Sequence, residues 1–137
     1  MDKVKFFCLD VSGSMSNDDL NRALSVMADR AKPQDYVVLF DCEVVAFEKV
    51  EDAMRKIRKS PLSLHEAIAS ICTGPHKGRG GTDARECYQT VCEYQQSHQI
   101  CDGVLILLSD GLMPQDQIAV FDEFVDITKS SPTPSAT

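Results

Sequence analysis

A carboxylate and two hydroxyls stand close together in the chain, directly after an apolar run. The segment VKFFCLDVSGS, from Val4 to Ser14, places Asp10 at the end of the run, with Ser12 and Ser14 following at alternate positions. Carboxylate and hydroxyl oxygens are hard ligands of the kind that Mg²⁺ prefers. Three such groups on one tight loop indicate a candidate metal site, although Asp and Ser are also favoured in turns and helix caps.

Two further segments supply oxygen ligands of the same type. Thr82 lies in the glycine-rich stretch Gly80-Gly81-Thr82-Asp83, and Asp110 follows the apolar run from Val104 to Ser109. In an open parallel α/β sheet, the loops beyond the carboxyl ends of the strands meet at one crevice. The sequence therefore predicts a single site built from five oxygen-bearing side chains, namely Asp10, Ser12, Ser14, Thr82 and Asp110.

The order of these motifs is Asp-x-Ser-x-Ser, then Thr on a glycine-rich loop, then Asp-Gly after an apolar strand. It resembles the von Willebrand factor type A (vWA) domain with its metal-ion-dependent adhesion site (MIDAS). The resemblance covers residues 3–129, and the Gly-Gly-Thr-Asp form looks most like the intracellular and prokaryotic members. It implies a three-layer, doubly wound α/β fold of the Rossmann-like kind. The mostly parallel sheet would have the strand order 3-2-1-4 and an antiparallel edge strand.

The resemblance also implies a function. In that family, an Asp or Glu carboxylate from a partner protein completes the coordination of the bound metal, which we expect to be Mg²⁺, with Mn²⁺ or Ca²⁺ as alternatives. Ser12, Ser14 and Thr82 would bind the metal directly, and Asp10 and Asp110 would act mainly through bound waters. We therefore expect a cytoplasmic recruiter or scaffold subunit that is not an enzyme, with an AAA+ ATPase complex as a candidate partner.

Two alternative functions stay open at this point. Asp10 could be the nucleophile of a Mg²⁺-dependent phosphohydrolase, but phosphatases of that kind carry a second Asp two residues further on as acid and base, where this chain has Ser12. The metal site could also be vestigial on a vWA-like scaffold.

Two other patterns are incomplete. The loop from Gly74 to Thr82 lacks the Gly-Lys-Ser/Thr ending of a phosphate-binding P-loop. The segment His65-Glu66-Ala67-Ile68-Ala69 lacks the second His of the zinc-protease helix. Neither pattern supports catalysis.

Composition and charge restrict the class of partner. The chain has 137 residues, 43% hydrophobic and 26% charged, which is typical of one globular domain. Its formal net charge is -7, which disfavours nucleic acids and anionic membranes. The basic stretch Arg55–Lys59 is expected to be a solvated helix end. The domain is expected to span residues 1–129 and to end in a flexible tail at 130–137.

Six cysteines occur mostly within apolar periodic segments and form no Cys-x-x-Cys pair. Small buried hydrophobes have this distribution, and the charged start Met1-Asp2-Lys3 is unlike a signal peptide. We therefore expect free thiols rather than disulfides or a zinc site. The six are Cys8, Cys42, Cys72, Cys87, Cys92 and Cys101.

Apolar periodicity predicts alternating strands and helices. The expected strands are 4–9, 36–40, 43–47 and 103–109, and the second and third form an antiparallel hairpin because the gap between them is too short for a crossover. Helices are expected from the N-cap Ser16 to Pro33, and at 50–59, 64–72 and 84–97. Asp83 and Glu86 are expected to form a capping box at the start of the last of these.

The expected C-terminal element is a helix, because Ile118, Phe121, Phe124, Val125 and Thr128 have helical spacing. With no further strand, the run from Gly103 to Ser109 would be an exposed sheet edge, which invites pairing with another chain. We therefore expect the domain to lack the last strands of the vWA fold and to form a homodimer through this edge.

Overall fold

The computed structural model describes residues 3–57, 63–72 and 81–128, and for residues 63–65 the backbone alone. Five strands form one sheet in the order β3-β2-β1-β4-β5. They are β1 (Lys5–Asp10), β2 (Tyr36–Phe40), β3 (Val44–Lys49), β4 (Val104–Ser109) and β5 (Glu123–Asp126). The tail at 130–137 and most of the glycine-rich loop lie outside the described residues.

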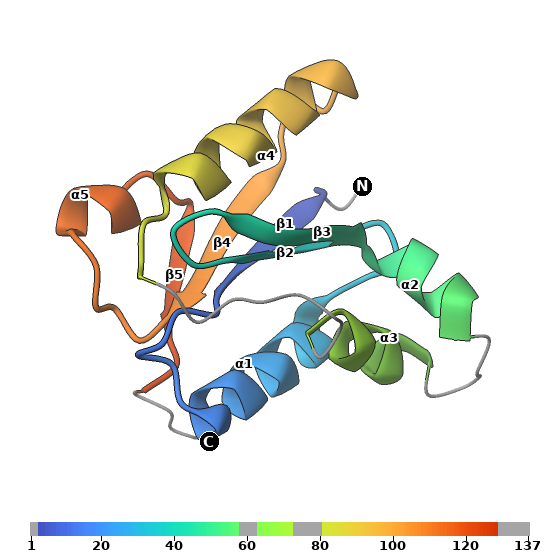
Figure 1. Cartoon of the computed structure of the whole chain (residues 1–137). Helices are drawn as coiled ribbons and strands as arrows, with labels where there is room; N and C mark the ends of the chain where they lie inside the picture. The colour runs from blue at the N-terminus through green and yellow to red at the C-terminus, as the bar shows by residue number, and fades with distance from the viewer. Residues whose placement is uncertain (1–2, 58–62, 73–80, 129–137) are drawn as a thin grey trace, which may run out of the picture.

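Helices cover both faces of this sheet (Figure 1). One face packs against α1 (Asn17–Arg30), α2 (Val50–Ile57) and α3 (Ser63–Cys72), and the other against α4 (Arg85–Ser97) and the short α5 (Gln115–Ile118). Strands β1, β2, β4 and β5 run parallel to one another, and β3 is antiparallel to its neighbour β2. The expected α/β class, mostly parallel sheet and antiparallel edge hairpin are therefore confirmed.

The central strand β1 is buried on both faces. Phe7 and Leu9 pack into the core beneath α1 and α3, whereas Phe6 and Cys8 pack into the core beneath α4. Side chains alternate between the two faces of a strand, so a strand covered by helices on both sides must be apolar at every position. This requirement explains the uninterrupted apolar run that ends at Asp10.

The first helix begins as the sequence predicts. The hydroxyl of Ser16 accepts a hydrogen bond from the Asp19 backbone N–H, and the Asp19 carboxylate accepts one from the Ser16 N–H, which completes a capping box. The hydrogen bond from the Ser16 N–H is the main cause that holds the pKa of Asp19 below its usual value, and the guanidinium of Arg22 lowers this pKa further. The capping box fixes the direction in which the chain leaves the loop after β1.

The expected C-terminal helix is wrong. The helix α5 ends at Ile118, and the chain then returns to pair in parallel with β4 as the strand β5. Phe124 packs on the α4 side of the sheet and the adjacent Val125 on the α1 side, which is a strand alternation. Pairing also satisfies the backbone groups along the free side of β4, an outcome that helical spacing in the sequence does not reveal.

Since β5 covers β4, the strand from Val104 to Ser109 is not a sheet edge. Arg22 secures the new edge by donating from Nε to the Ile127 carbonyl at 2.9 Å, and Arg30 pairs with Glu123 through two hydrogen bonds of 2.8 Å. The expected strand order 3-2-1-4 is thus extended by one strand. The reason given for a homodimer through β4 no longer holds.

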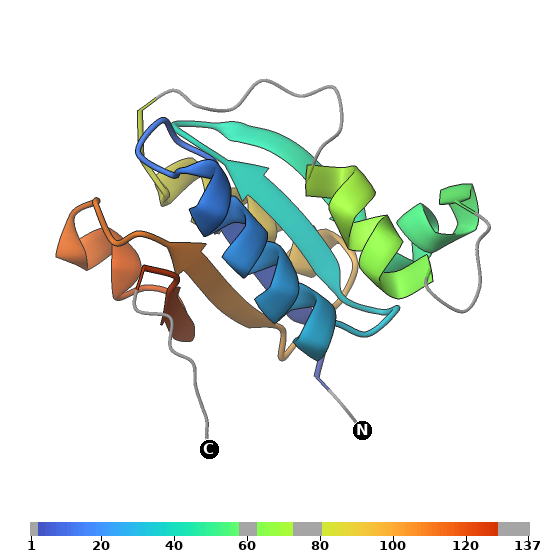
Figure 2. The same cartoon turned by 90° about the horizontal axis from the view of Figure 1, so that it is seen from below.

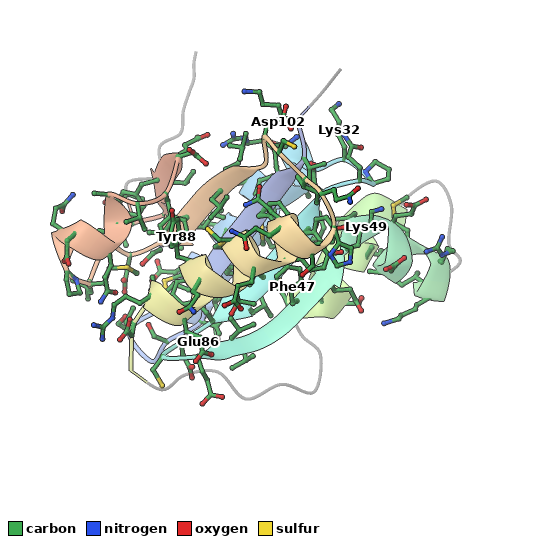
Figure 3. The ribbon with its side chains drawn as sticks, turned by 90° about the horizontal axis from the view of Figure 1, so that it is seen from above. Lys32, Phe47, Lys49, Glu86, Tyr88 and Asp102 are labelled. Atoms are coloured by element: carbon green, nitrogen blue, oxygen red, sulfur yellow. The ribbon has the colours of Figure 1, made fainter. Side chains whose placement is uncertain are left out.

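At the amino end of β2, α4 packs on a cluster of aromatic rings near Phe47 and Lys49 (Figure 3). The hydroxyls of Tyr36 and Tyr94 are 2.8 Å apart there. A surface hollow of about 880 Å³ opens beside these rings. Its three cationic side chains each have a carboxylate partner, in the pairs Lys49–Glu51, Arg55–Asp52 and Lys56–Glu48. These charges neutralise one another.

All six cysteines lie in the described residues, and none forms a disulfide. Cys8 and Cys87 are buried in the core, and burial raises the pKa of the Cys72 thiol to about 12. Within residues 3–57, 63–72 and 81–128, no helix has the length and apolar character needed to cross a membrane.

Candidate metal centre

The five predicted ligands belong to three segments that lie at the carboxyl end of the sheet (Figures 1 and 2). Asp10 is the last residue of β1, and Asp110 directly follows β4, which pairs with β1. The segment that carries Thr82 joins this end through a hydrogen bond of 2.9 Å from the Asp83 N–H to the Asp41 carbonyl, just beyond β2. The topology thus brings all three motifs to one end of the sheet, as the sequence predicts.

Asp10 is fully buried, with 0% of its surface exposed. Its Oδ1 accepts a hydrogen bond of 2.8 Å from the Ser12 backbone N–H, and its Oδ2 accepts one of 2.7 Å from the Ser109 hydroxyl. Both donors are neutral. The carboxylate is therefore oriented and partly stabilised, but its negative charge has no cationic side chain beside it among the described residues.

Two other buried carboxylates in the described part of the chain have a cationic partner. Asp35 pairs with the Lys5 ammonium at 2.9 Å, and Asp19 pairs with Arg22 at 2.5 Å. Removing an ionised carboxylate from water is costly unless an opposite charge or a metal ion compensates it. Asp10, by contrast, has neutral donors at both oxygens, and it lies where the sequence predicts a cation.

The two serine hydroxyls lie next to each other on the loop after β1. The Oγ atoms of Ser12 and Ser14 are 3.2 Å apart, and the Met15 N–H donates to the Ser12 carbonyl at 3.1 Å, which tightens the turn. Ser12 is buried and Ser14 is exposed. One hydroxyl therefore faces the protein interior and the other is open to solvent, as suits a metal bound at the surface end of the loop.

Thr82 is half-buried, and its neighbours differ from the prediction. The Asp83 carboxylate accepts from the backbone N–H and the guanidinium of Arg85, and these interactions hold the pKa of Asp83 near 2. Glu86, visible on α4 in Figure 3, does not return to Asp83 but accepts from the Val44 N–H of β3. The predicted capping box is therefore wrong, since a local contact with Arg85 engages the Asp83 side chain and a tertiary contact with Val44 engages that of Glu86.

Asp110 is half-buried and held by a tight turn. Its Oδ1 accepts from the Leu112 N–H at 3.0 Å and lies 3.4 Å from the Ser109 hydroxyl. Gly111 has a φ of +82°, a conformation that glycine adopts without strain. The glycine of the Asp-Gly motif thus allows the chain to turn sharply while Asp110 stays at the end of β4.

The role of Ser109 in the site was not predicted from the sequence, where this residue is expected only to end a strand. This residue is fully buried, donates to Asp10 and accepts from the Gly111 N–H at 3.1 Å, so one hydroxyl joins the first and third motifs. A polar residue ending an otherwise apolar buried strand is the signal that identifies it. No comparable sequence pattern identifies Asp41 and Gln117, which hold the Thr82 segment through hydrogen bonds.

The chemistry of this site depends on hydroxyl groups. In the described part of the chain, no three His, Cys, Asp or Glu side chains are grouped as a metal site. The ligands that the sequence predicts here are instead serine and threonine oxygens together with the two carboxylates. An all-oxygen set is suited to a hard dication such as Mg²⁺ and unsuited to soft or thiolate-seeking metals. A comparison with models of known protein families finds none that matches the chain.

Proposed function

We propose that this chain is a metal-dependent protein-interaction module of the vWA type, which binds an Asp or Glu carboxylate of a partner through Mg²⁺. The observation that carries the proposal is the burial of Asp10 between two neutral donors, the Ser12 N–H and the Ser109 hydroxyl. A buried carboxylate without a cationic side chain at the end of a central parallel strand favours a dication. The order of the Ser12, Ser14, Thr82 and Asp110 motifs supports the same ligand set.

A bound Mg²⁺ would supply positive charge at a rigid position. Ser12, Ser14 and Thr82 would hold it through neutral hydroxyls, and Asp10 and Asp110 would act through waters. All the ligands that bind the ion directly would be neutral. The ion would therefore keep a strong affinity for an external anion. A side-chain carboxylate of a partner protein is the simplest such anion, and the family resemblance adds an AAA+ ATPase complex as a candidate partner.

The partner would approach over the loops that follow β1 and β4. Ser14 is exposed, Thr82 and Asp110 are half-buried, and the side chain of Leu112 is 67% exposed beside Asp110. An exposed large apolar side chain adjoining the site offers contact area that a free carboxylate ligand would not use. The binding surface therefore favours a protein partner over a small anion.

Hydrolysis of phosphate esters is the competing activity, and the geometry adds nothing in its favour. The position that would hold a second catalytic Asp is Ser12, whose hydroxyl is 3.2 Å from that of Ser14. A serine there has too high a pKa to act as the acid and base at neutral pH. We therefore propose coordination without turnover.

Paired peptides that differ only in Glu against Gln test the proposal. The unmodified protein should bind a Glu peptide in Mg²⁺, lose it on chelation, and bind no Gln peptide. Asp10→Ala should abolish Mg²⁺ binding by calorimetry while the fold survives, whereas Asp18→Ala, at an exposed carboxylate on α1, should change neither. Mg²⁺-dependent hydrolysis of a generic phosphate ester that requires Asp10 would instead establish the enzyme.

A further inference from the structure

The N-terminus of α4 is capped by a side chain from another element. Ala84, the residue before this helix, has no polar side chain and makes no side-chain cap. Its own buried N–H instead donates to the Oε1 of Gln117 at 2.9 Å, across 33 residues of sequence. Gln117 lies on the short helix α5 and is only 9% exposed. It therefore supplies the acceptor that the N3 Glu or Gln of a capping box usually provides for the N-cap N–H.

This hydrogen bond connects two of the three metal-binding motifs. Ala84 follows Thr82 and Asp83 in the chain, and Gln117 lies on the helix that follows Asp110. The preceding N–H, that of Asp83, donates to the Asp41 carbonyl at 2.9 Å. The stretch next to Thr82 is thus held at two successive backbone groups, one by the residue that follows β2 and one by α5.

We propose that Gln117 is a positioning residue of the metal centre, which fixes the Thr82 hydroxyl relative to Asp110 without touching the metal. The inference rests on the proposed function. A buried amide side chain is costly unless its polar atoms are used, and Gln117 uses its oxygen on the segment that carries a ligand. Groups that orient metal ligands influence affinity although they do not coordinate, and their loss typically weakens metal binding by about 10–100-fold.

Three variants separate positioning from general packing. Gln117→Leu keeps an apolar stem of similar size but removes the acceptor, so Mg²⁺ affinity measured by calorimetry should fall by about tenfold or more. Gln117→Glu keeps an acceptor for the Ala84 N–H and should restore most of the affinity. Gln115→Leu, on the exposed face of the same helix, should leave the affinity unchanged.

A measurement on the unmodified chain covers the case in which Gln117→Leu does not fold. Linkage requires that, if Gln117 positions the site, Mg²⁺ in turn stabilises the Gln117–Ala84 bond. Hydrogen exchange of the Ala84 amide should therefore slow on addition of Mg²⁺, while that of His98 at the far end of α4 should not.

The possible failures are distinguishable. If the unmodified chain binds no Mg²⁺, both the proposed function and this inference are overturned. If the unmodified chain binds Mg²⁺ and Gln117→Leu binds it equally well, only the role of Gln117 is overturned. The same holds if the exchange rate of the Ala84 amide does not change on addition of Mg²⁺. Equal weakening by Gln115→Leu would likewise assign the effect to the packing of α5 and not to the hydrogen bond.

Discussion

Replacing Ser109 by Ala removes one buried oxygen and leaves the rest of the site unchanged. In the native protein this hydroxyl donates to Asp10 at 2.7 Å and accepts from the Gly111 N–H at 3.1 Å. The variant therefore loses a hydrogen bond to a buried charge and an acceptor for the turn that carries Asp110. Both losses fall on residues that the proposed metal requires.

The expected magnitude follows from these two contacts. A hydrogen bond to a charged group contributes about 1.5–3 kcal/mol to stability, and Asp10 has no exposure to water that could replace it. The Gly111 N–H is half-buried, so solvent can compensate it in part. We expect the free energy of unfolding to fall by about 2 kcal/mol, which lowers Tm by about 8 °C for a chain of this length. The Mg²⁺ affinity should fall by about 10–100-fold.

Chemical denaturation without metal measures the first effect, and calorimetry with Mg²⁺ measures the second. Ser70→Ala is the matched control, because Ser70 is an exposed serine on α3 whose hydroxyl bonds only within its own helix, and its stability change should stay within about 0.5 kcal/mol. If Ser109→Ala were as stable as the control variant and bound Mg²⁺ normally, the idea that Asp10 depends on neutral donors in a dry environment would be refuted.

Three further outcomes follow from the same structure. Thr82→Ala should weaken binding of a Glu peptide in Mg²⁺ more than Asp83→Ala does, because the Asp83 carboxylate is engaged by Arg85. Equal losses of affinity in a binding titration would contradict these separate roles of Thr82 and Asp83. Arg85→Gln should raise the pKa of Asp83 from near 2 toward 3.8, followed by NMR. The stability that depends on the depressed pKa is present above pH 3.8 in the native protein and is lost as pH falls toward 2. The variant, in which the pKa is no longer depressed, should lack this contribution, and an unchanged titration would exclude the Arg85 effect. Amide exchange through residues 104–108 should be slow in a monomer, because β5 and β1 flank β4; fast exchange would show that β5 does not hold.

Much of the fold could be predicted because local and global requirements agree. The strand at 36–40 has the predicted limits, and β1 begins and ends within one residue of them. Burial by helices on both faces makes such strands apolar throughout, and short gaps force hairpins. The capping box of Ser16 and Asp19 was equally predictable, because it involves residues close together in sequence.

The prediction failed where distant residues decide the structure. Phe124 and Val125 fit a helical repeat as well as a strand, and the choice depends on the free side of β4, which only the assembled sheet presents. Asp83 and Glu86 have the spacing of a capping box, but the Glu86 carboxylate accepts from Val44, which is distant in sequence. The Asp83 carboxylate is engaged by Arg85, two residues further on. The five candidate ligands could be named because their residue types carry the chemistry. The residues that support them could not, because Ser109 and Gln117 act through contacts made in the folded chain.

An anomalous scattering map of crystals soaked in Mn²⁺ tests the central claim most directly, since Mn²⁺ accepts the same oxygen ligands and can be located unambiguously. The account predicts one ion bonded to the hydroxyl oxygens of Ser12, Ser14 and Thr82, with the carboxylates of Asp10 and Asp110 reached through waters. A map with no ion at this end of the sheet under saturating Mn²⁺, or with ions only at exposed carboxylates elsewhere, would contradict it.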